Sequence, residues 1–283
     1  MALTVNTNTT SLGVQKNLNR ASDALSTSMT RLSSGLKINS AKDDAAGLQI
    51  ATRMTSQIRG QTMAIKNAND GISIAQTAEG AMQEQTNILQ RMRELAVQSR
   101  NDSNSEDDRN ALDAEYQSML EEIDRIAAST QLNGKSLLNG DAGVMTFQVG
   151  SSATANDQIE IDLSSDMSSA GVLSGLATTV ITGADSATAE TNFAAAIAAI
   201  DTALQTINTT RADLGAAQNR LTSTVNNLQN INENAEAARG RVQDTDFAAE
   251  TAQLTKQQTL QQASTSVLAQ ANQLPSAVLK LLQ

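Results

Sequence analysis

The hydrophobic pattern is helical at both ends of the chain. Near the N-terminus, residues recur at alternating four- and three-residue spacing, at Leu18, Ser22, Leu25, Met29, Leu32 and Leu36. The C-terminal end repeats this spacing at Leu260, Ser264, Val267, Ala271, Leu274, Val278 and Leu281. Such heptad spacing keeps one narrow stripe of a helix facing a partner helix. Because neither stripe is buried by its own helix, we predict that the two terminal helices pair with each other.

The middle of the chain also has a helical period. One pattern runs from about Ala45 to Gln98, and a second begins at Ser105, which is placed to cap a helix that starts with three acidic residues. The longest pattern runs from Phe193 to Val242 without a slip, which corresponds to a helix roughly 75 Å long. Polar residues within this last stripe are expected to fix the helix register: Arg211, Gln218, Asn232 and Arg239.

Strand-like alternation occurs in one region. Met145, Phe147 and Val149 alternate with polar residues, and so do Ile159, Ile161 and Leu163. Two such runs across a polar connection predict a small β-hairpin at about 144–163. The pairs Asn133-Gly134 and Asn139-Gly140, just before it, are turn signals. Residues 164–189 have no firm periodicity and are predicted to form a loop or weakly ordered segment.

These elements predict a mainly α fold of long antiparallel helices. A terminal coiled-coil pair is expected from residues 1–44 and 241–283. A helical rod domain is expected from residues 45–163 and 190–240, with the β-hairpin at its far turn and a short variable segment at 164–189. The composition agrees, because the chain has one proline, one tyrosine, three phenylalanines and no tryptophan. Its apolar content is mostly the Ala, Leu, Ile, Val and Met of long packed helices.

Candidate chemistry is sparse. The chain has no cysteine and no histidine, which excludes disulfides, thiolate or imidazole metal sites, and catalytic triads that use either residue. Asp43–Asp44 and Glu106–Asp108 lack the glycine and ligand spacing of a calcium loop, so we interpret them as partners of helix N-termini. No phosphate loop or dinucleotide fingerprint is present. We therefore expect no metal, no cofactor and no enzymatic activity.

The net charge and the hydropathy of the chain narrow the classes of partner that it is expected to bind. A net charge of −10 argues against nucleic-acid binding, which depends on clustered Lys and Arg. No stretch reaches the roughly 18 apolar residues of a membrane span. The first ten residues have neither a basic region nor an apolar region of the kind found in a cleavable secretory signal. What remains is surface for association with other protein chains.

Several runs resemble bacterial flagellin, in an order that covers roughly residues 1–140 and 190–283. Toward the C-terminus they are VQDTDFAAETA at 242–252 and LAQANQLP at 268–275. Toward the N-terminus they are RLSSGLKINSAKDDAAG at 31–47, NDGISIAQT at 69–77 and LQRMRELAVQS at 89–99. The resemblance implies a short flagellin that lacks large outer domains.

The resemblance also implies a function and partners. Such a subunit self-polymerises beyond the hook into the extracellular filament that drives swimming, after type III export without a cleaved signal. Other copies, cap and hook–filament junction proteins, and an export chaperone at the C-terminal segment are the implied partners. A hook–filament junction protein shares terminal helices of this kind, and a monomeric secreted coiled-coil adhesin is an alternative of another class.

Two sets of site residues follow. The terminal stripes are expected to form a polymerisation seam that is complete only in the polymer: Leu18, Leu25, Met29, Leu32, Leu36, Leu260, Val267, Ala271, Leu274, Val278 and Leu281. In flagellins of this type, an innate immune receptor contacts the residues that match Arg91, Leu95 and Glu115. The resemblance therefore implies a receptor-binding surface at these three positions.

Overall fold

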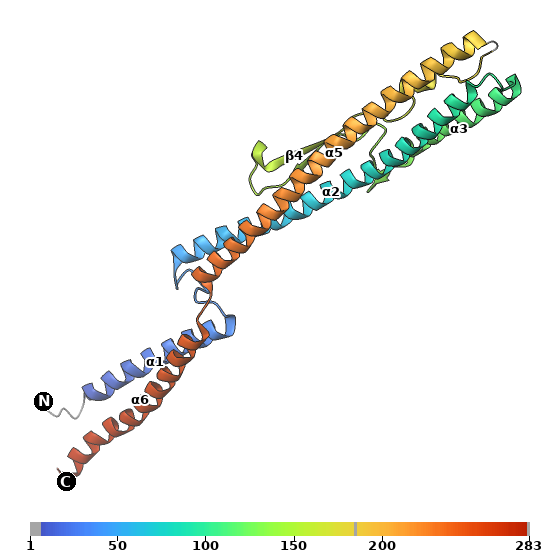
Figure 1. The fold of residues 1–283 in the computed structure, drawn as a ribbon. Coiled ribbons are helices and arrows are strands. Elements are labelled where there is room, and N and C mark those ends of the chain that lie inside the picture. The colour runs from blue at the N-terminus through green and yellow to red at the C-terminus, as the bar shows by residue number, and fades with distance from the viewer. Residues whose placement is uncertain (1–6, 184–185, 282–283) are drawn as a thin grey trace. The chain divides into compact units, whose positions relative to one another are not determined.

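The computed structural model describes residues 7–183 and 186–281, and the side chains within them except that of residue 186 and those from 274 onward. The helices of this part are long, as the periodicity predicts (Figure 1). They are α1 (Thr9–Ser34), α2 (Ala45–Ser99), α3 (Glu106–Ser129), the short α4 (Ser174–Ala177), α5 (Ser186–Gln243) and α6 (Phe247–Leu281). The strands are β1 (Gln131–Leu132), β2 (Lys135–Ser136), β3 (Gly143–Gln148) and β4 (Gln158–Leu163).

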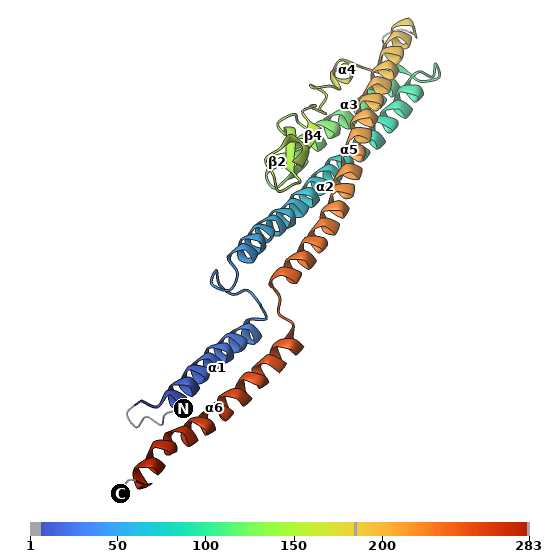
Figure 2. The same cartoon turned by 90° about the vertical axis from the view of Figure 1, so that its left-hand side faces the viewer.

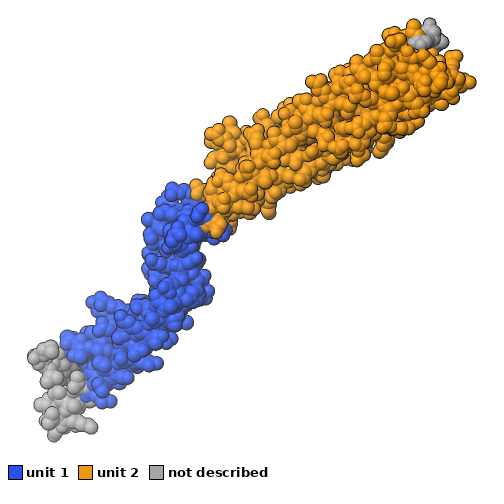
Figure 3. Space-filling model, in the orientation of Figure 1, with its two compact units in different colours: residues 1–56, 234–283 blue, residues 57–233 orange. Residues whose placement is uncertain are grey.

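The chain divides into two compact units, which Figure 3 shows in separate colours. Unit 1 contains residues 1–56 and 234–283, and unit 2 contains residues 57–233. The division therefore lies inside α2 and α5, because both helices have residues in each unit. The expected domain edges near 44 and 241 instead mark the breaks between helices, at 35–44 and 244–246.

Unit 1 contains the predicted pairing of the terminal helices, because α1 and α6 pack against each other. Asn8 caps α1 by accepting a 3.0 Å hydrogen bond from the Ser11 amide. Gly35 ends the helix at a φ of 73°, and its amide donates to the Arg31 carbonyl. Leu36 therefore lies outside the helix, contrary to the prediction, and forms an antiparallel bridge with Asp244.

The two helix breaks of unit 1 lie side by side. The Lys37 amide donates to the Gln243 carbonyl at 2.6 Å, and the Thr245 amide donates to the Gly35 carbonyl at 3.0 Å. On the N-terminal segment, Asp44 accepts a 2.9 Å hydrogen bond from the Gly47 amide and so caps α2. These backbone bonds satisfy groups that the helix ends would otherwise leave unpaired.

The acidic residues at 43 and 44 bind different backbone amides. Asp43 accepts hydrogen bonds from the Ser40 and Asn39 amides, and these bonds lower the pKa of its carboxyl group. Asp44 caps the following helix. The contact of Asp44 agrees with its interpretation as a partner of a helix N-terminus, whereas Asp43 instead holds the loop that precedes the helix.

Unit 2 is built on α2, α3 and α5, which lie side by side in Figures 1 and 2. Their facing sides share one core, which includes Met82 and Leu89 of α2, Tyr116 and Ile123 of α3, and Ile207 and Leu221 of α5. The predicted stripe of α5 is confirmed: every residue of its 193–242 pattern is buried or half-buried. α3 begins with the predicted cap, in which Ser105 and Asp108 satisfy each other's backbone amides.

Polar residues within the α5 stripe contact particular residues of α2. Glu79 accepts a 2.9 Å hydrogen bond from the Gln218 side chain and lies 3.8 Å from the Arg211 guanidinium. The Asn232 amide donates to the Thr62 hydroxyl at 3.4 Å. A shift of either helix by one turn would break all three contacts, which is how a polar residue in a seam opposes other registers.

The predicted β-hairpin is also confirmed. β3 and β4 pair antiparallel, with Gly143 opposite Leu163 and Gln148 opposite Gln158. The Phe147 side chain packs where α2 comes close to α5, at Gly71. A β-carbon there would lie 3.1 Å from the Leu221 side chain and 3.2 Å from the Phe147 ring, so a side chain would separate these elements.

Residues 164–183 correct the prediction of a loose segment. Their backbone is largely irregular, but Met167, Leu173, Leu176 and Ile181 are buried in the core. α3 holds this segment through polar side chains. Asp124 accepts from the Ser169 amide at 2.6 Å, Asp113 accepts from the Ile181 amide at 2.8 Å, and Tyr116 shares a 2.9 Å hydrogen bond with Thr179. An irregular backbone gives no period, so the sequence pattern did not reveal these anchors.

Candidate assembly and recognition surfaces

The interface between α1 and α6 is built on small side chains. Ser11, Ala21 and Ser28 of α1 are buried, and so is Ala271 of α6. On α1 these small residues alternate with half-buried leucines, at Leu18, Leu25 and Leu32. Small residues let two helices approach closely while the leucines between them supply the contact area. Three of the predicted seam residues of α1 therefore face α6.

The other half of the predicted α1 stripe is rotated away from α6. Met29 is 57% exposed and Ser22 is exposed, whereas Ala21 and Ser28, one position earlier, are buried. The hydrophobic pattern follows the larger apolar residues, and Met29 is larger than Ser28. The seam at 11, 18, 21, 25, 28 and 32 is equally periodic, but its small residues gave no hydrophobic signal.

On α6, too, the face that packs against its partner differs from the predicted stripe. Leu260 is 45% exposed and Val267 is 46% exposed, although both were placed in the seam. Among the described side chains of α6, the half-buried and buried positions are Glu250, Leu254, Gln257, Gln261, Ser264, Leu268 and Ala271. Within the subunit, Ala271 and Ser264 therefore face α1, while Leu260 and Val267 lie on an adjacent face. The side chains of Leu274, Val278 and Leu281 lie outside the described residues.

Polar contacts fix the register of the α1–α6 pair. The Asn8 side-chain amide donates to the Ala271 carbonyl at 2.8 Å, and the Ser11 hydroxyl donates to Asn272 Oδ1 at 2.8 Å. At the other end, the Arg31 guanidinium lies 3.7 Å from the Glu250 carboxylate. The pair is therefore pinned near both ends of α1.

Large apolar side chains remain exposed on this pair. We call Leu12, Met29, Leu260 and Val267 the exposed apolar set. Single exposed apolar residues are common on proteins, but here the two helices bury mainly small residues and leave larger ones in solvent. Burying one such Leu or Val side chain stabilises an association by about 1.5–3 kcal/mol. Unit 1 thus has apolar surface available to a further chain.

The predicted receptor surface centres on Arg91. Its guanidinium lies 2.9 Å from the Glu115 carboxylate of α3 and 3.0 Å from the Glu94 carboxylate of α2. These hydrogen bonds, that to Glu115 above all, raise the pKa of Arg91. All three side chains of this cluster are substantially exposed. Arg91 and Glu115 therefore form one accessible charged patch that joins two helices.

Leu95 does not belong to this surface. Its side chain is fully buried in the core of unit 2, so it cannot contact a partner while the helices stay packed. A spacing of four residues puts it one turn further along α2 on nearly the same face as Arg91, but there the side chain packs into the core. We correct its expected role from a receptor contact to a support of the helix that carries Arg91.

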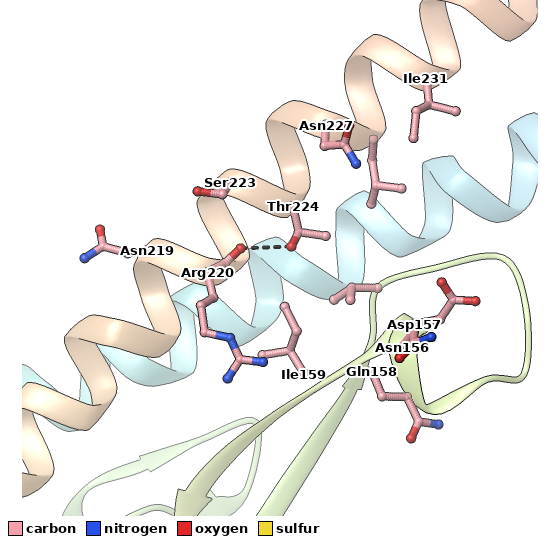
Figure 4. Close-up of a pocket in the computed structure, with 12 residues that line it drawn as sticks. Asn156, Asp157, Gln158, Ile159, Asn219, Arg220, Ser223, Thr224, Asn227 and Ile231 are labelled. Atoms are coloured by element: carbon pink, nitrogen blue, oxygen red, sulfur yellow. Dashed lines mark hydrogen bonds between the residues drawn. The ribbon is translucent and has the colours of Figure 1, made fainter.

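A pocket of about 610 Å³ lies between α5 and the chain leading into β4 (Figure 4). Asn156, Asn219, Arg220 and Asn227 line it with polar side chains, and Ile159 and Ile231 add apolar ones. Asp157, at its edge, accepts hydrogen bonds from the Ser152 amide and the Thr154 hydroxyl, so it is engaged in holding its own loop. These residues include no nucleophile paired with a base, and the pocket has no catalytic arrangement.

The described residues hold no cluster of acidic side chains arranged to bind a metal ion. Among them, no helix is both long enough and apolar enough to cross a bilayer.

Comparisons with known proteins agree with the helical design. Residues 5–142 match the family model described as the bacterial flagellin N-terminal helical region, and residues 197–282 match the C-terminal helical region. Between the two matches lie β3, β4, α4 and the beginning of α5. The family models thus cover the helices and leave out the hairpin and most of the irregular segment.

Flagellins of Vibrio species are similar to this chain over its whole length. The chain is 40% identical to polar flagellin C of Vibrio parahaemolyticus and 41% identical to flagellin A of Vibrio anguillarum, with all of each protein covered. A putative flagellar hook-associated protein from Vibrio parahaemolyticus shares the fold, with a TM-score of 0.61 over 71% of this chain and 100% of that one, at 14% identity.

The alignment with polar flagellin C extends over 385 positions, so this chain, at 283 residues, is the shorter of the two. Both helical regions are nevertheless present, in the family's order. The chain belongs to the bacterial flagellin family, whose members are structural subunits of the flagellar filament rather than enzymes.

Proposed function

We propose that this chain polymerises through unit 1, and that the exposed apolar set of the α1–α6 pair is buried against neighbouring copies in the extracellular filament. The family implies self-polymerisation into a flagellar filament, and swimming motility follows from that role. The single observation that carries the proposal is the exposure of Leu12, Met29, Leu260 and Val267 beside a seam made of small residues.

The α1–α6 pair gains more apolar burial in a filament than in a single subunit. A pair of helices that buries serines and alanines gains little apolar area, so it is weakly stabilised in a lone subunit. Each copy added to a filament removes several larger side chains from water. The contact then repeats along the fibre, and the gain per subunit offsets the entropy lost when the subunit is immobilised. The remaining seam residues with undescribed side chains, Leu274, Val278 and Leu281, are proposed to extend the same surface.

The same surface suggests the other partners. We propose that an export chaperone covers the C-terminal part of α6 before assembly, because an exposed apolar helix face in a concentrated cytoplasm favours premature association. Junction and cap proteins of the flagellum are proposed to bind the two ends of the filament through this surface.

A second function is favoured by the Arg91–Glu115 patch. We propose that it binds the innate immune receptor of the host when the subunit is free. Its support is an exposed, oriented guanidinium at the position implied by the family resemblance. Arginine in such a setting is a frequent centre of binding energy at protein interfaces.

Elongation from seeds tests the main proposal. The purified chain is added to fragments of preformed flagellar filaments, and filament lengths are measured by electron microscopy. A filament subunit extends the seeds in proportion to the concentration of added chain. A junction protein would bind the ends and stop growth, and a monomeric adhesin would leave the seeds unchanged; either result would overturn the proposal.

A further inference from the structure

Two copies of the same tripeptide occur close together in unit 2, with different geometry. Leu132-Asn133-Gly134 and Leu138-Asn139-Gly140 both contain an asparagine followed by glycine. This pair of residues is where an asparagine side chain can react with the following backbone amide, because glycine has no β-carbon to obstruct the approach. Leucine precedes the asparagine in both copies, so the reactivity of the two asparagines can be compared within one protein.

Asn133 lies in an open turn. It and Gly134 connect β1 to β2, with φ angles of 53° and 76°, the signature of a two-residue hairpin loop. The Asn133 side chain is exposed and makes no hydrogen bond within the described part of the chain. The Gly134 amide likewise donates to no group there, and the space around Gly134 is open.

Asn139 is held on all sides. Its Oδ1 accepts a 3.1 Å hydrogen bond from the Asp141 amide, and its Nδ2 donates to the Asp141 carboxylate. Its backbone is bridged to Asp166. A β-carbon at Gly140 would lie 3.3 Å from the Ser164 carbonyl oxygen, so this turn is enclosed where the other is open.

From this contrast, we propose that Asn133 is a site of spontaneous deamidation in the folded protein, and that Asn139 is protected. Solvent base removes the Gly134 amide proton, and that nitrogen attacks Asn133 Cγ, forming a C–N bond. The bond from Cγ to the side-chain nitrogen breaks, and ammonia leaves. Water then adds to one of the two carbonyls of the resulting succinimide and opens it to aspartate or isoaspartate.

The cost of reaching the reactive geometry is small at Asn133. β1 and β2 have only two residues each, so the hairpin that fixes the turn is short. Opening it disturbs little of the core, because Leu132 is only half-buried against it and the fully buried residues of this region, Leu137 and Leu138, follow the hairpin. The hairpin must open by local fluctuation before Asn133 can reach the reactive geometry, and short exposed hairpins open readily.

The product differs from the starting protein in charge and backbone length. A carboxylate replaces a neutral amide beside Lys135, and isoaspartate adds a methylene group to the main chain. The two-residue turn requires a left-handed backbone at both positions, so a lengthened backbone breaks the pairing of Leu132 with Lys135. The modified form would therefore accumulate as the protein ages, and the structural change would be confined to the β1–β2 hairpin that follows α3.

Peptide mass spectrometry tests the proposal directly. The full folded chain is incubated in mildly alkaline buffer, and samples are digested with trypsin, with a zero-time digest subtracted. Cleavage at Lys135 separates the two sites, because Asn133 falls in residues 126–135 and Asn139 in residues 136–211. An isoaspartate-specific methyltransferase assay identifies the rearranged product.

We expect Asn133 to react at least about tenfold faster than Asn139, because each hydrogen bond that holds Asn139 is worth roughly a factor of five in an equilibrium. In denaturant, where both turns are lost, the two rates should become similar. N133Q should abolish the signal in the first peptide.

Three results would overturn the proposal. One is equal rates at the two sites in the folded chain. Another is an unchanged ratio in denaturant, which would assign the difference to the flanking sequence rather than to the fold. The third is a persistent signal in the first peptide of N133Q.

Discussion

The Ser11 hydroxyl and Asn272 Oδ1 are joined by a 2.8 Å hydrogen bond across 261 positions of sequence. Ser11 is buried at the α1–α6 interface, one turn from the residue that caps α1. This contact fixes which face of α1 meets α6. The remaining faces, with their larger apolar side chains, are consequently exposed.

Overpacking tests this register. Ala21→Leu adds a large side chain to a position that is buried against α6, and overpacking of this kind costs about 1–3 kcal/mol. We expect faster amide hydrogen exchange along α1 and α6 in the monomer. Ser22→Leu is the matched control, since Ser22 is exposed and the same side chain fits there without displacing α6. The opposite order of effects would restore the register predicted from the hydrophobic pattern.

Tyr116 reports on the attachment of residues 164–183. It is the single tyrosine of the chain, is fully buried and shares a hydrogen bond with Thr179. Burial raises the pKa of its hydroxyl, so the folded state disfavours the tyrosinate. Its contribution to stability is therefore complete below the unfolded pKa of about 10 and is lost as the pH rises through the higher folded pKa.

Absorbance of tyrosinate during an alkaline titration checks this expectation. The folded chain should ionise its tyrosine above the pH at which the urea-unfolded chain does. Thr179→Val, which removes the hydroxyl partner and leaves the burial, should keep the midpoint raised. Coincident midpoints for folded and unfolded chain would show that Tyr116 is accessible to solvent.

The receptor surface is tested by removing its charges together. Arg91→Ala with Glu115→Ala deletes the ion pair without changing the net charge, and exposed pairs of this kind contribute only about 0–1 kcal/mol to folding. We expect the double variant to fold normally and to signal weakly in cells that carry the receptor. Arg125→Ala with Glu122→Ala, another exposed pair on α3, is the control and should signal fully. Equal signalling by both double variants would reject the Arg91–Glu115 assignment.

The sequence predicted the helices, the hairpin and the pairing of the chain ends, because each depends on a period that apolar residues display directly. The α5 stripe is correct along its whole length, since large side chains mark its buried face. Met29, Leu260 and Val267 do not face the partner helix within the subunit, so their place in the polymerisation seam stays a prediction. Ser11, Ala21 and Ser28 are buried by close helix approach, which a hydrophobicity pattern does not reveal.

Residues 164–183 and Leu95 show a second limit of the pattern. The irregular segment is anchored by hydrogen bonds from Asp113, Tyr116 and Asp124, whose partners are distant in sequence. Leu95 shares a short run with Arg91, and only the orientation of α2 separates the inward side chain from the outward one. The packing of the folded chain determines both the anchoring of residues 164–183 and the burial of Leu95. No short sequence pattern specifies that packing.

The effect of Val267→Asp on seeded filament growth tests the central claim most directly. Val267 is exposed in the subunit, so the charge should leave the thermal unfolding of the monomer nearly unchanged. In the filament, the same carboxylate would be buried without a partner, which costs more than the lost burial. Gln262→Asp is the control, because Gln262 is exposed on the opposite side of α6. We predict no elongation of seeds by Val267→Asp and normal elongation by Gln262→Asp; normal filaments from Val267→Asp would contradict assembly through the exposed apolar set.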